Sequence, residues 1–142
     1  MQFLTESADV RVVEGPAAAG TTDLTSDSVD MAGYDGVLFI AHMGAITSSA
    51  VTSLKAQQSS DDGDADSFAD LAGASVTIPD DGDDSCFVLD VYQPRERYVL
   101  CVLDRGTQNA VLNGIIAIPY RANSRPITPT STTTQVRDVA EA

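Results

Sequence analysis

Three apolar runs in the second half of the sequence constrain the fold of this chain more than any other feature. They cover residues 86–92, 98–103 and 110–118, and they are rich in β-branched side chains. The polar segments QPRER and DRGTQN separate them, a pattern typical of consecutive antiparallel strands. Because no other part of the chain is so densely apolar, residues 85–120 must supply the centre of any core.

Earlier segments add shorter strand patterns. Residues 8–14 and 28–31 predict short strands, and the apolar run 37–43 predicts a strand that is buried on both faces. Residues 46–58 alternate with a period of two, as in a strand with one solvated face. A helix is the alternative there, but the density of Ser and Thr favours the strand. Residues 15–27 predict a loop from their Gly, Pro, Thr and Asp content.

About eight short strands, with turn signals between them, predict an all-β fold: a single-domain antiparallel β-sandwich or a jelly-roll-like barrel with extended terminal arms. We expect an N-terminal arm at 1–7, a sandwich domain at 8–125 and an extended Thr/Pro-rich C-terminal tail at 126–142. A chain of 142 residues buries enough surface to fold without a metal or cofactor. Its sequence predicts neither a signal peptide nor a membrane span.

Two local features leave alternatives open. Asn113-Gly114 lies between apolar residues, which is the strongest two-residue hairpin signal. The arm before it is too short for a convincing partner strand, so we favour a bulge or bend within one strand. Cys86 and Cys101 fall in neighbouring predicted strands, and a disulfide between them is conceivable. Two free thiols are the preferred interpretation in a reducing compartment.

The charge of the chain is strongly negative. The sequence has 21 Asp and Glu against 8 Lys and Arg, a formal net charge of −13. Phosphates would meet a negative field, which argues against binding to nucleic acid. The acids concentrate in residues 59–84. Within this segment the short runs 68–71 and 75–78 are expected to anchor two acidic loops, one at each end of this pair of runs. Like charges at this density predict hydrated, exposed loops.

Asp62, Asp64 and Asp66 have the spacing with which calcium-binding loops begin. The rest of that pattern fails, because Ser67 stands where the loop needs glycine and Gly73 stands where a bidentate Glu is expected. These three aspartates are therefore weak calcium candidates, and a solvated acidic loop is the preferred interpretation.

His42 is the only histidine of the chain, and it lies in the apolar run 37–43. A single histidine in such a run is typically a structural residue, with its polar atoms satisfied. A zinc site would have to combine it with Cys86 and Cys101, without any close ligand pair. A serine nucleophile would need it as base, without a nucleophile elbow. We expect no catalytic residue, no cofactor and no enzymatic activity.

Five of the eight basic residues fall at the ends and turns of the central apolar runs. They are Arg95, Arg97, Arg105, Arg121 and Arg125. One interpretation is that these arginines only keep strand ends soluble. The other is that they form a basic side opposite an acidic side and dock onto an acidic protein surface, where Arg is the favoured cation.

The central motifs resemble a group of small structural proteins from the virions of tailed bacteriophages. The resemblance covers residues 29–126 and is clearest in AQQSSDDG (56–63), YQPRERYV (92–99) and TQNAVLNGIIAI (107–118). Proteins of this group and size include capsid decoration (cement) proteins and head-tail joining or tail proteins. The resemblance implies no catalytic residues.

From this resemblance we expect a capsid decoration protein that binds the outer surface of a phage head and stabilises it. The expected partners are the major capsid protein or another virion protein, and further copies of the chain as a trimer or dimer, with no nucleic acid and no membrane. The expected location is the virion, assembled in the host cytoplasm. A neck, head-tail joining or tail component is one alternative, and a non-viral β-sandwich module that binds carbohydrate or calcium is another.

Overall fold

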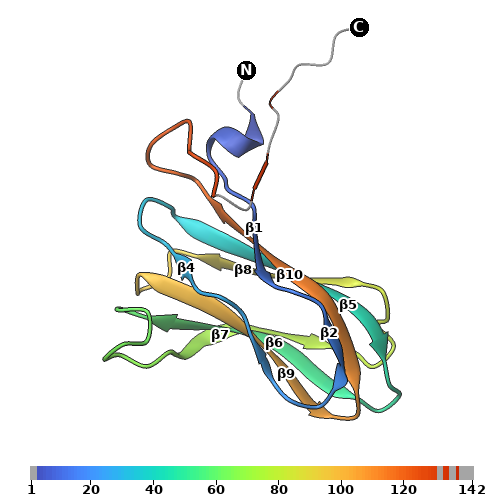
Figure 1. Ribbon diagram of the computed structural model, residues 1–142. Coiled ribbons are helices and arrows are strands. Elements are labelled where there is room, and N and C mark those ends of the chain that lie inside the picture. Colours follow the sequence, from blue (N-terminus) through green and yellow to red (C-terminus); the bar gives the residue numbers. More distant parts are fainter. Residues whose placement is uncertain (1–2, 131–132, 135–136, 138–142) are drawn as a thin grey trace, which may run out of the picture.

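The chain folds into two antiparallel β-sheets that pack face to face (Figure 1). The computed structural model describes residues 3–130, 133–134 and 137. Within these residues one short 3₁₀ turn, η1 (Leu4–Glu6), precedes the strands. The strands of the same part are β1 (Arg11–Glu14), β2 (Ala17–Gly20), β3 (Leu24–Thr25), β4 (Val29–Asp30), β5 (Gly36–Ile46), β6 (Val51–Ser59), β7 (Ala69–Ile78), β8 (Cys86–Tyr92), β9 (Tyr98–Thr107) and β10 (Ala110–Tyr120). The expected all-β sandwich is confirmed.

The two sheets have related strand orders. Sheet A has the order β1-β10-β5-β8, and β2 also pairs with β10. Sheet B has the order β3-β9-β6-β7, and β4 also pairs with β9. The three central strands therefore do not pair with one another, because β5 lies between β8 and β10 in sheet A, while β9 belongs to sheet B. Cys86 and Cys101 consequently lie in different sheets, and both are free thiols, as the preferred interpretation has it.

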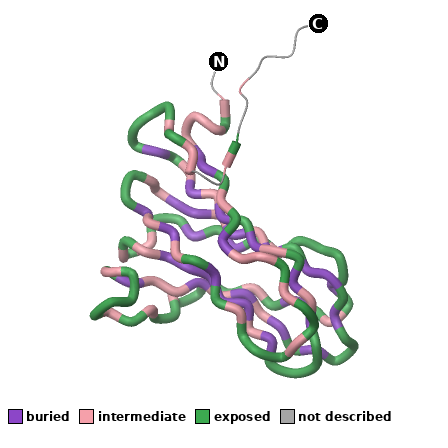
Figure 2. Tube along the Cα trace, in the orientation of Figure 1, coloured by how far each residue is buried: buried purple, intermediate pink, exposed green. Residues whose placement is uncertain are grey.

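The core lies between the sheets and is built from alternate residues of the long strands. Figure 2 shows the buried positions on the facing sides of the two layers. Each fully buried large aliphatic or aromatic side chain contributes about 1.5–3 kcal/mol of transfer free energy. The largest of these side chains include Phe39, Met43, Leu54, Leu103, Leu112 and Ile115. All three predicted central runs contribute to this core.

Two segments differ from the expected pattern. Residues 15–27 were expected to be a loop, but they contain β2 and β3, which add to the edges of β10 and β9. The alanines and glycine of β2 have weak strand preference, and β3 is only two residues long, so the pairing comes from the long partner strands. Residues 68–71 and 75–78 were expected as two separate runs, but all of them except Phe68 belong to one strand, β7, which passes through Gly73 with φ +80°.

The alternatives at two other segments are resolved. β10 is continuous through Asn113-Gly114, and its pairing with β5 shifts between Leu112 and Gly114, so the bulge interpretation is confirmed. The alternating segment 46–58 is a strand rather than a helix, but β6 begins only at Val51, after a turn at 47–50.

Candidate functional site

Four of the five predicted interface arginines lie at one end of the sandwich. Strands β8 and β10 both finish beside the start of β5, since Tyr92 and Tyr120 each pair with Gly36. The loop after β8 holds Arg95 and Arg97, and the segment after β10 holds Arg121 and Arg125. We call this region the arginine end. The fold brings these four residues together from segments that are about 30 positions apart in sequence.

Two of these arginines already hold carboxylates. The guanidinium of Arg97 donates two hydrogen bonds of 2.8 Å to the carboxylate of Asp30 and lies 5.2 Å from the ring centre of Tyr98. The hydrogen bonds from Arg97 lower the pKa of Asp30, and in turn they raise the pKa of Arg97. Arg121 lies 3.4 Å from Asp35. These pairs position the loops and leave less charge for a partner.

Arg95 and Arg125 are exposed, and neither makes an ion pair with any residue that the structure describes. The backbone amide of Arg95 donates to the side chain of Gln58, which fixes the loop while the guanidinium stays in solvent. A polar pocket of about 520 Å³ lies beside it, lined by Tyr34, Gln93, Arg97 and their neighbours. Arg95 and Arg125 are thus the arginines of this end that are best placed to contact another molecule.

Arg105 does not belong to this surface. It lies near the opposite end, is only 4% exposed, and donates hydrogen bonds to the backbone oxygens of Ala18, Thr22 and Ala110 at 2.7–2.9 Å. This guanidinium ties the β2–β3 segment to the start of β10. We therefore remove Arg105 from the predicted interface and assign it a structural role. The sequence does not distinguish it from the other arginines, because its partners are backbone oxygens, two of them 83 and 87 positions away in the chain.

Both terminal segments run beside the arginine end, where Figure 1 shows the chain entering and leaving. The amides of Ala122 and Ile127 donate to the backbone oxygens of Ser7 and Glu6 at 2.9 and 3.1 Å. Arg137 donates to Thr5, so the described part of the predicted tail also contacts the predicted arm. The remainder of the predicted tail, residues 131–132, 135–136 and 138–142, lies outside the described residues.

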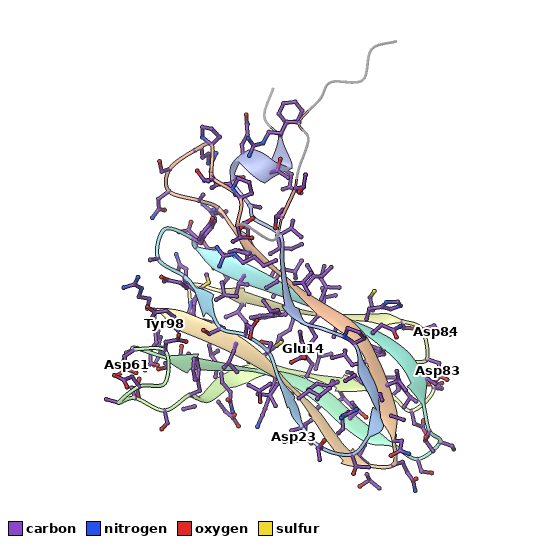
Figure 3. The ribbon with its side chains drawn as sticks, viewed as in Figure 1. Glu14, Asp23, Asp61, Asp83, Asp84 and Tyr98 are labelled. Carbon is purple, nitrogen blue, oxygen red and sulfur yellow. The ribbon has the colours of Figure 1, made fainter. Side chains whose placement is uncertain are left out.

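The two acidic loops lie at opposite ends of β7, as predicted. Figure 3 shows Asp61 at one end of the sandwich and Asp83 and Asp84 at the other. The loop that contains Asp61 is therefore on the same end as the arginines, so the expected separation into an acidic and a basic side does not hold there. The opposite loop holds four aspartates, and none of them makes an ion pair with a described residue.

The weak calcium candidates do not converge on a common point. Asp62 accepts a hydrogen bond from Ser28, and Asp66 accepts bonds from the amide and hydroxyl of Ser60 at 2.9 Å. These bonds from Ser60 lower the pKa of Asp66. Among the described residues, no group of three or more His, Cys, Asp or Glu could hold a metal ion. The carboxylates of Asp61 and Asp66 act instead as acceptors for backbone amides of this loop.

The outer face of sheet A is apolar, which the sequence reasoning missed. Val12 pairs with Ile116, Ile116 with Ile40, and Ile40 with Val88, so these four residues form one row across the sheet. Val12 is 65% exposed, Val88 53% and Ile116 37%. The sequence does carry a signal for this face, because these strands have apolar residues at both alternating positions. That pattern predicts burial on both faces, whereas in the structure only the face toward sheet B is covered.

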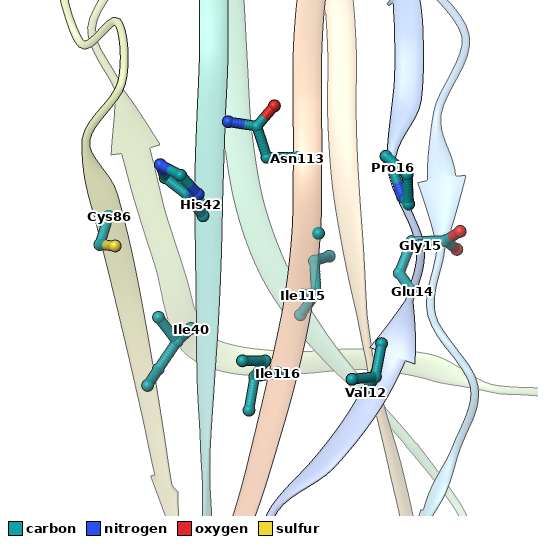
Figure 4. A pocket seen from close by; sticks show the side chains of 11 residues that line it. Val12, Glu14, Gly15, Pro16, Ile40, His42, Cys86, Asn113, Ile115 and Ile116 are labelled. Carbon is teal, nitrogen blue, oxygen red and sulfur yellow. The ribbon is translucent and has the colours of Figure 1, made fainter. Parts of the chain in front are cut away.

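This row borders a groove of about 420 Å³ (Figure 4). His42 lies on the groove beside Cys86, its partner in the β5–β8 pairing. His42 is exposed, so the expectation that the run 37–43 is buried on both faces is wrong. The strand is buried on one face only, and His42 points to the other. Figure 4 shows Asn113 nearby, whose amide donates to the backbone oxygen of Met43 at 3.4 Å.

Comparisons with known proteins define the fold. No protein-family model matches the sequence, and no curated protein sequence matches it either. Among solved structures, the chain is similar to the PBSX exported protein XepA, with a TM-score of 0.56 and 15% identity over 99% of this chain. It spans 46% of the length of XepA. The SPBc2 prophage-derived protein YomS has a TM-score of 0.47 and 9% identity, with 79% of this chain and 93% of YomS covered.

The chain therefore shares its β-sandwich fold with a prophage protein about twice its length. At 15% identity the likeness shows the fold alone. In the part of the chain that the structure describes, no helix has the length and apolar character needed to cross a membrane.

Proposed function

We propose that this chain is a structural protein of a bacteriophage particle, and specifically a decoration protein on the outer surface of the head. The observation that supports this most directly is the match of 99% of the chain to the fold of a prophage-encoded protein. The resemblance of its central motifs to phage virion proteins points the same way. The role is mechanical and needs neither catalysis nor a cofactor.

In this proposal the arginine end faces the head. Arg95 and Arg125 contact acidic side chains of the major capsid protein, since exposed arginines form bidentate contacts with carboxylates. The terminal segments lie beside them and extend the contact across neighbouring subunits. The acidic loop at 79–85 lies at the opposite end and faces solvent. Further copies of the chain form a homo-oligomer, and neither nucleic acid nor a membrane takes part.

The test is binding of purified protein to heads that lack it. Replacing Arg95 and Arg125 together by Glu should lower head occupancy at least about tenfold, because attraction becomes repulsion. The control is Lys55→Glu, which reverses a charge on β6, away from the arginine end. It is compared with each single variant, Arg95→Glu or Arg125→Glu, because these make the same change in net charge. The melting temperature of each variant is measured in parallel, since Lys55 also pairs with Asp70. Equal occupancy for the double variant and the control would contradict docking through the arginine end.

Deletion of residues 126–142 tests the contribution of the tail. The proposal expects lower occupancy and a lower disruption temperature of the decorated heads, because the tail no longer spans adjacent subunits. The free protein's unfolding temperature is measured in parallel, since the tail also contacts Thr5, Glu6 and Val10 within the chain. Unchanged occupancy and head stability would show that the tail plays no part in binding.

One observation favours a second candidate. XepA is named as an exported protein. By analogy, this chain would be a phage-encoded protein that is released from the host cell rather than kept in the particle. Fractionation of a lysate separates the two candidates, because a decoration protein sediments with particles and a released protein stays in the supernatant.

A further inference from the structure

The N-terminal turn and the loop that follows β10 hold each other at the tip of the arginine end. Figure 1 shows η1 next to this loop. The amide of Ala122 donates to the backbone oxygen of Ser7 at 2.9 Å. The amide of Ile127 donates to the backbone oxygen of Glu6 at 3.1 Å. These two hydrogen bonds lie on either side of Arg125 in the loop, so the N-terminal turn fixes the backbone that carries this arginine.

The turn is itself fixed to the rest of the chain. Within η1 the amide of Glu6 donates to the backbone oxygen of Phe3, and the amide of Phe3 donates to the Glu6 carboxylate, both at 3.1 Å. Directly after the turn, Ala8 is buried, and the amide of Asp9 donates to the backbone oxygen of Pro119 in β10 at 3.0 Å. The support under the loop is therefore anchored in sheet A.

Leu4 and Arg125 are presented side by side on this support. Both line a shallow hollow of about 330 Å³, together with Phe3 and Ser7. Leu4 is 77% exposed, although the turn that carries it is held in place. Arg125 donates from Nε to the backbone oxygen of Ala122 at 3.3 Å and makes no ion pair with a described residue. The tip thus offers one apolar side chain and one unpaired cation.

We propose that Leu4 and Arg125 form one contact element, which docks onto a protein surface where a carboxylate borders an apolar hollow. Arg125 binds the carboxylate through its planar guanidinium, and Leu4 fills the hollow. The N-terminal turn is a positioning element, because it holds both side chains in place before the partner arrives. A contact that is already ordered loses less conformational entropy on binding.

The charges around the tip explain why the partner must be partly apolar. Asp9 is 1% exposed and forms an ion pair of 2.9 Å with Arg11, and the Glu6 carboxylate accepts a backbone amide of its own turn. Neither acid is paired with Arg125. The net charge of −13 nevertheless repels an acidic partner at long range. A carboxylate alone is therefore a poor ligand for this end, and the apolar contact of Leu4 supplies the missing affinity.

Hydrogen exchange of the free protein tests the support. Ile127→Pro removes the amide that donates to Glu6, whereas Ile127→Ala keeps it. Thr128→Pro is the matched control, because the amide of Thr128 donates to no backbone oxygen within the described residues. Exchange at residues 121–125 should be at least about tenfold faster in Ile127→Pro and within about twofold of wild type in the other two variants. Equal exchange in Ile127→Pro and either control would overturn the positioning role of the turn.

Binding to heads that lack the protein tests the contact element. Leu4→Ala should weaken binding at least about tenfold, because it removes a preorganised apolar anchor. Val51→Ala is the matched control and should leave binding unchanged. Val51 is 64% exposed but lies at the start of β6, away from the arginine end.

A double-mutant cycle tests whether the turn acts through these two side chains. Ile127→Pro should weaken head binding in the otherwise wild-type chain. It should have no further effect when Leu4 and Arg125 are both replaced by Ala, because there is then no contact left to position. Additive losses would overturn the positioning role.

The inference names the partner chemistry of the arginine end and therefore rests on the proposed function. The head-binding experiment distinguishes the two failures. A wild-type chain that does not bind heads would overturn both. If the wild-type chain binds and Leu4→Ala binds as well as Val51→Ala, the proposed function stands and only this inference is overturned.

Discussion

At the scale of single residues, Arg105 and Asp61 hold loops in place through backbone atoms rather than through other side chains. Arg105 donates to three carbonyl oxygens from β2, the following turn and the start of β10. The carboxylate of Asp61 accepts hydrogen bonds from the amides of Ala65 and Asp66. From the sequence alone, both residues resemble exposed charges that could bind a partner. Replacing them tests whether their role is to stabilise the fold instead.

Replacing Arg105 by Ala should lower the free energy of unfolding by about 3–5 kcal/mol, because buried carbonyl groups lose a charged donor. Replacing the exposed Arg95 by Ala should change it by less than about 0.5 kcal/mol. Urea unfolding of the two variants and the wild type measures these differences in the free energy of unfolding. Similar losses for both would contradict the structural role of Arg105.

Asp61 gives a pH-dependent prediction. Hydrogen bonds from the amide of Ala65, and further bonds from Asp66 and Ser59, lower its pKa in the folded chain. Its stabilising effect is therefore present above the unfolded pKa of about 3.9 and is lost as the pH falls through the lower folded value. Asp61→Ala should reduce the melting temperature at pH 7, and the difference from wild type should vanish in strong acid. Asp64→Ala, with an exposed carboxylate, serves as the control, and a pH-independent difference would contradict the assignment.

At the scale of elements, the start of β5 depends on an aromatic side chain from β10. The ring of Tyr120 lies over Gly36, and its hydroxyl donates to Asp90 of β8, so one side chain bridges three strands of sheet A. A Cβ atom on residue 36 would lie only 2.4 Å from that ring. Burial and the bond to Asp90 raise the pKa of Tyr120, in keeping with a hydroxyl that remains protonated.

Gly36→Ala should therefore cost about 1–3 kcal/mol of stability, because the ring must leave its position. Gly15→Ala is the matched control, since a Cβ there has no neighbour within 4 Å. Thermal unfolding of both variants measures the two losses of stability. A loss of stability at Gly15 equal to that at Gly36 would contradict the role of the Tyr120 ring.

Local patterns were enough to predict the class of fold and most of the long strands, but not the continuity of β7. The period of two in β6 and the apolar runs of β8, β9 and β10 carry their own signal. The sequence could not show that β8, β9 and β10 alternate between sheets, because the pairing depends on contacts with β5 and β6. It also could not show β2, whose alanines have weak strand preference and pair only because β10 is there.

At the scale of the whole molecule, the candidate site was predicted in part. The gathering of Arg95, Arg97, Arg121 and Arg125 follows from their positions at strand ends. The burial of Arg105 and the exposure of the row on sheet A required the sandwich itself, because a run such as 37–43 does not reveal which of its faces is covered. Charge and apolar surface together distinguish two regions of the molecule, the arginine end and the outer face of sheet A.

The most direct test of the proposed function is the copy number of the chain in purified phage particles, measured by quantitative mass spectrometry against the major capsid protein. A decoration protein is expected at a fixed ratio to that protein, on the order of hundreds of copies per particle, as for subunits at every local symmetry axis. A ratio corresponding to about six or twelve copies, as in a ring at the neck or tail, would contradict it, and so would absence from the particle.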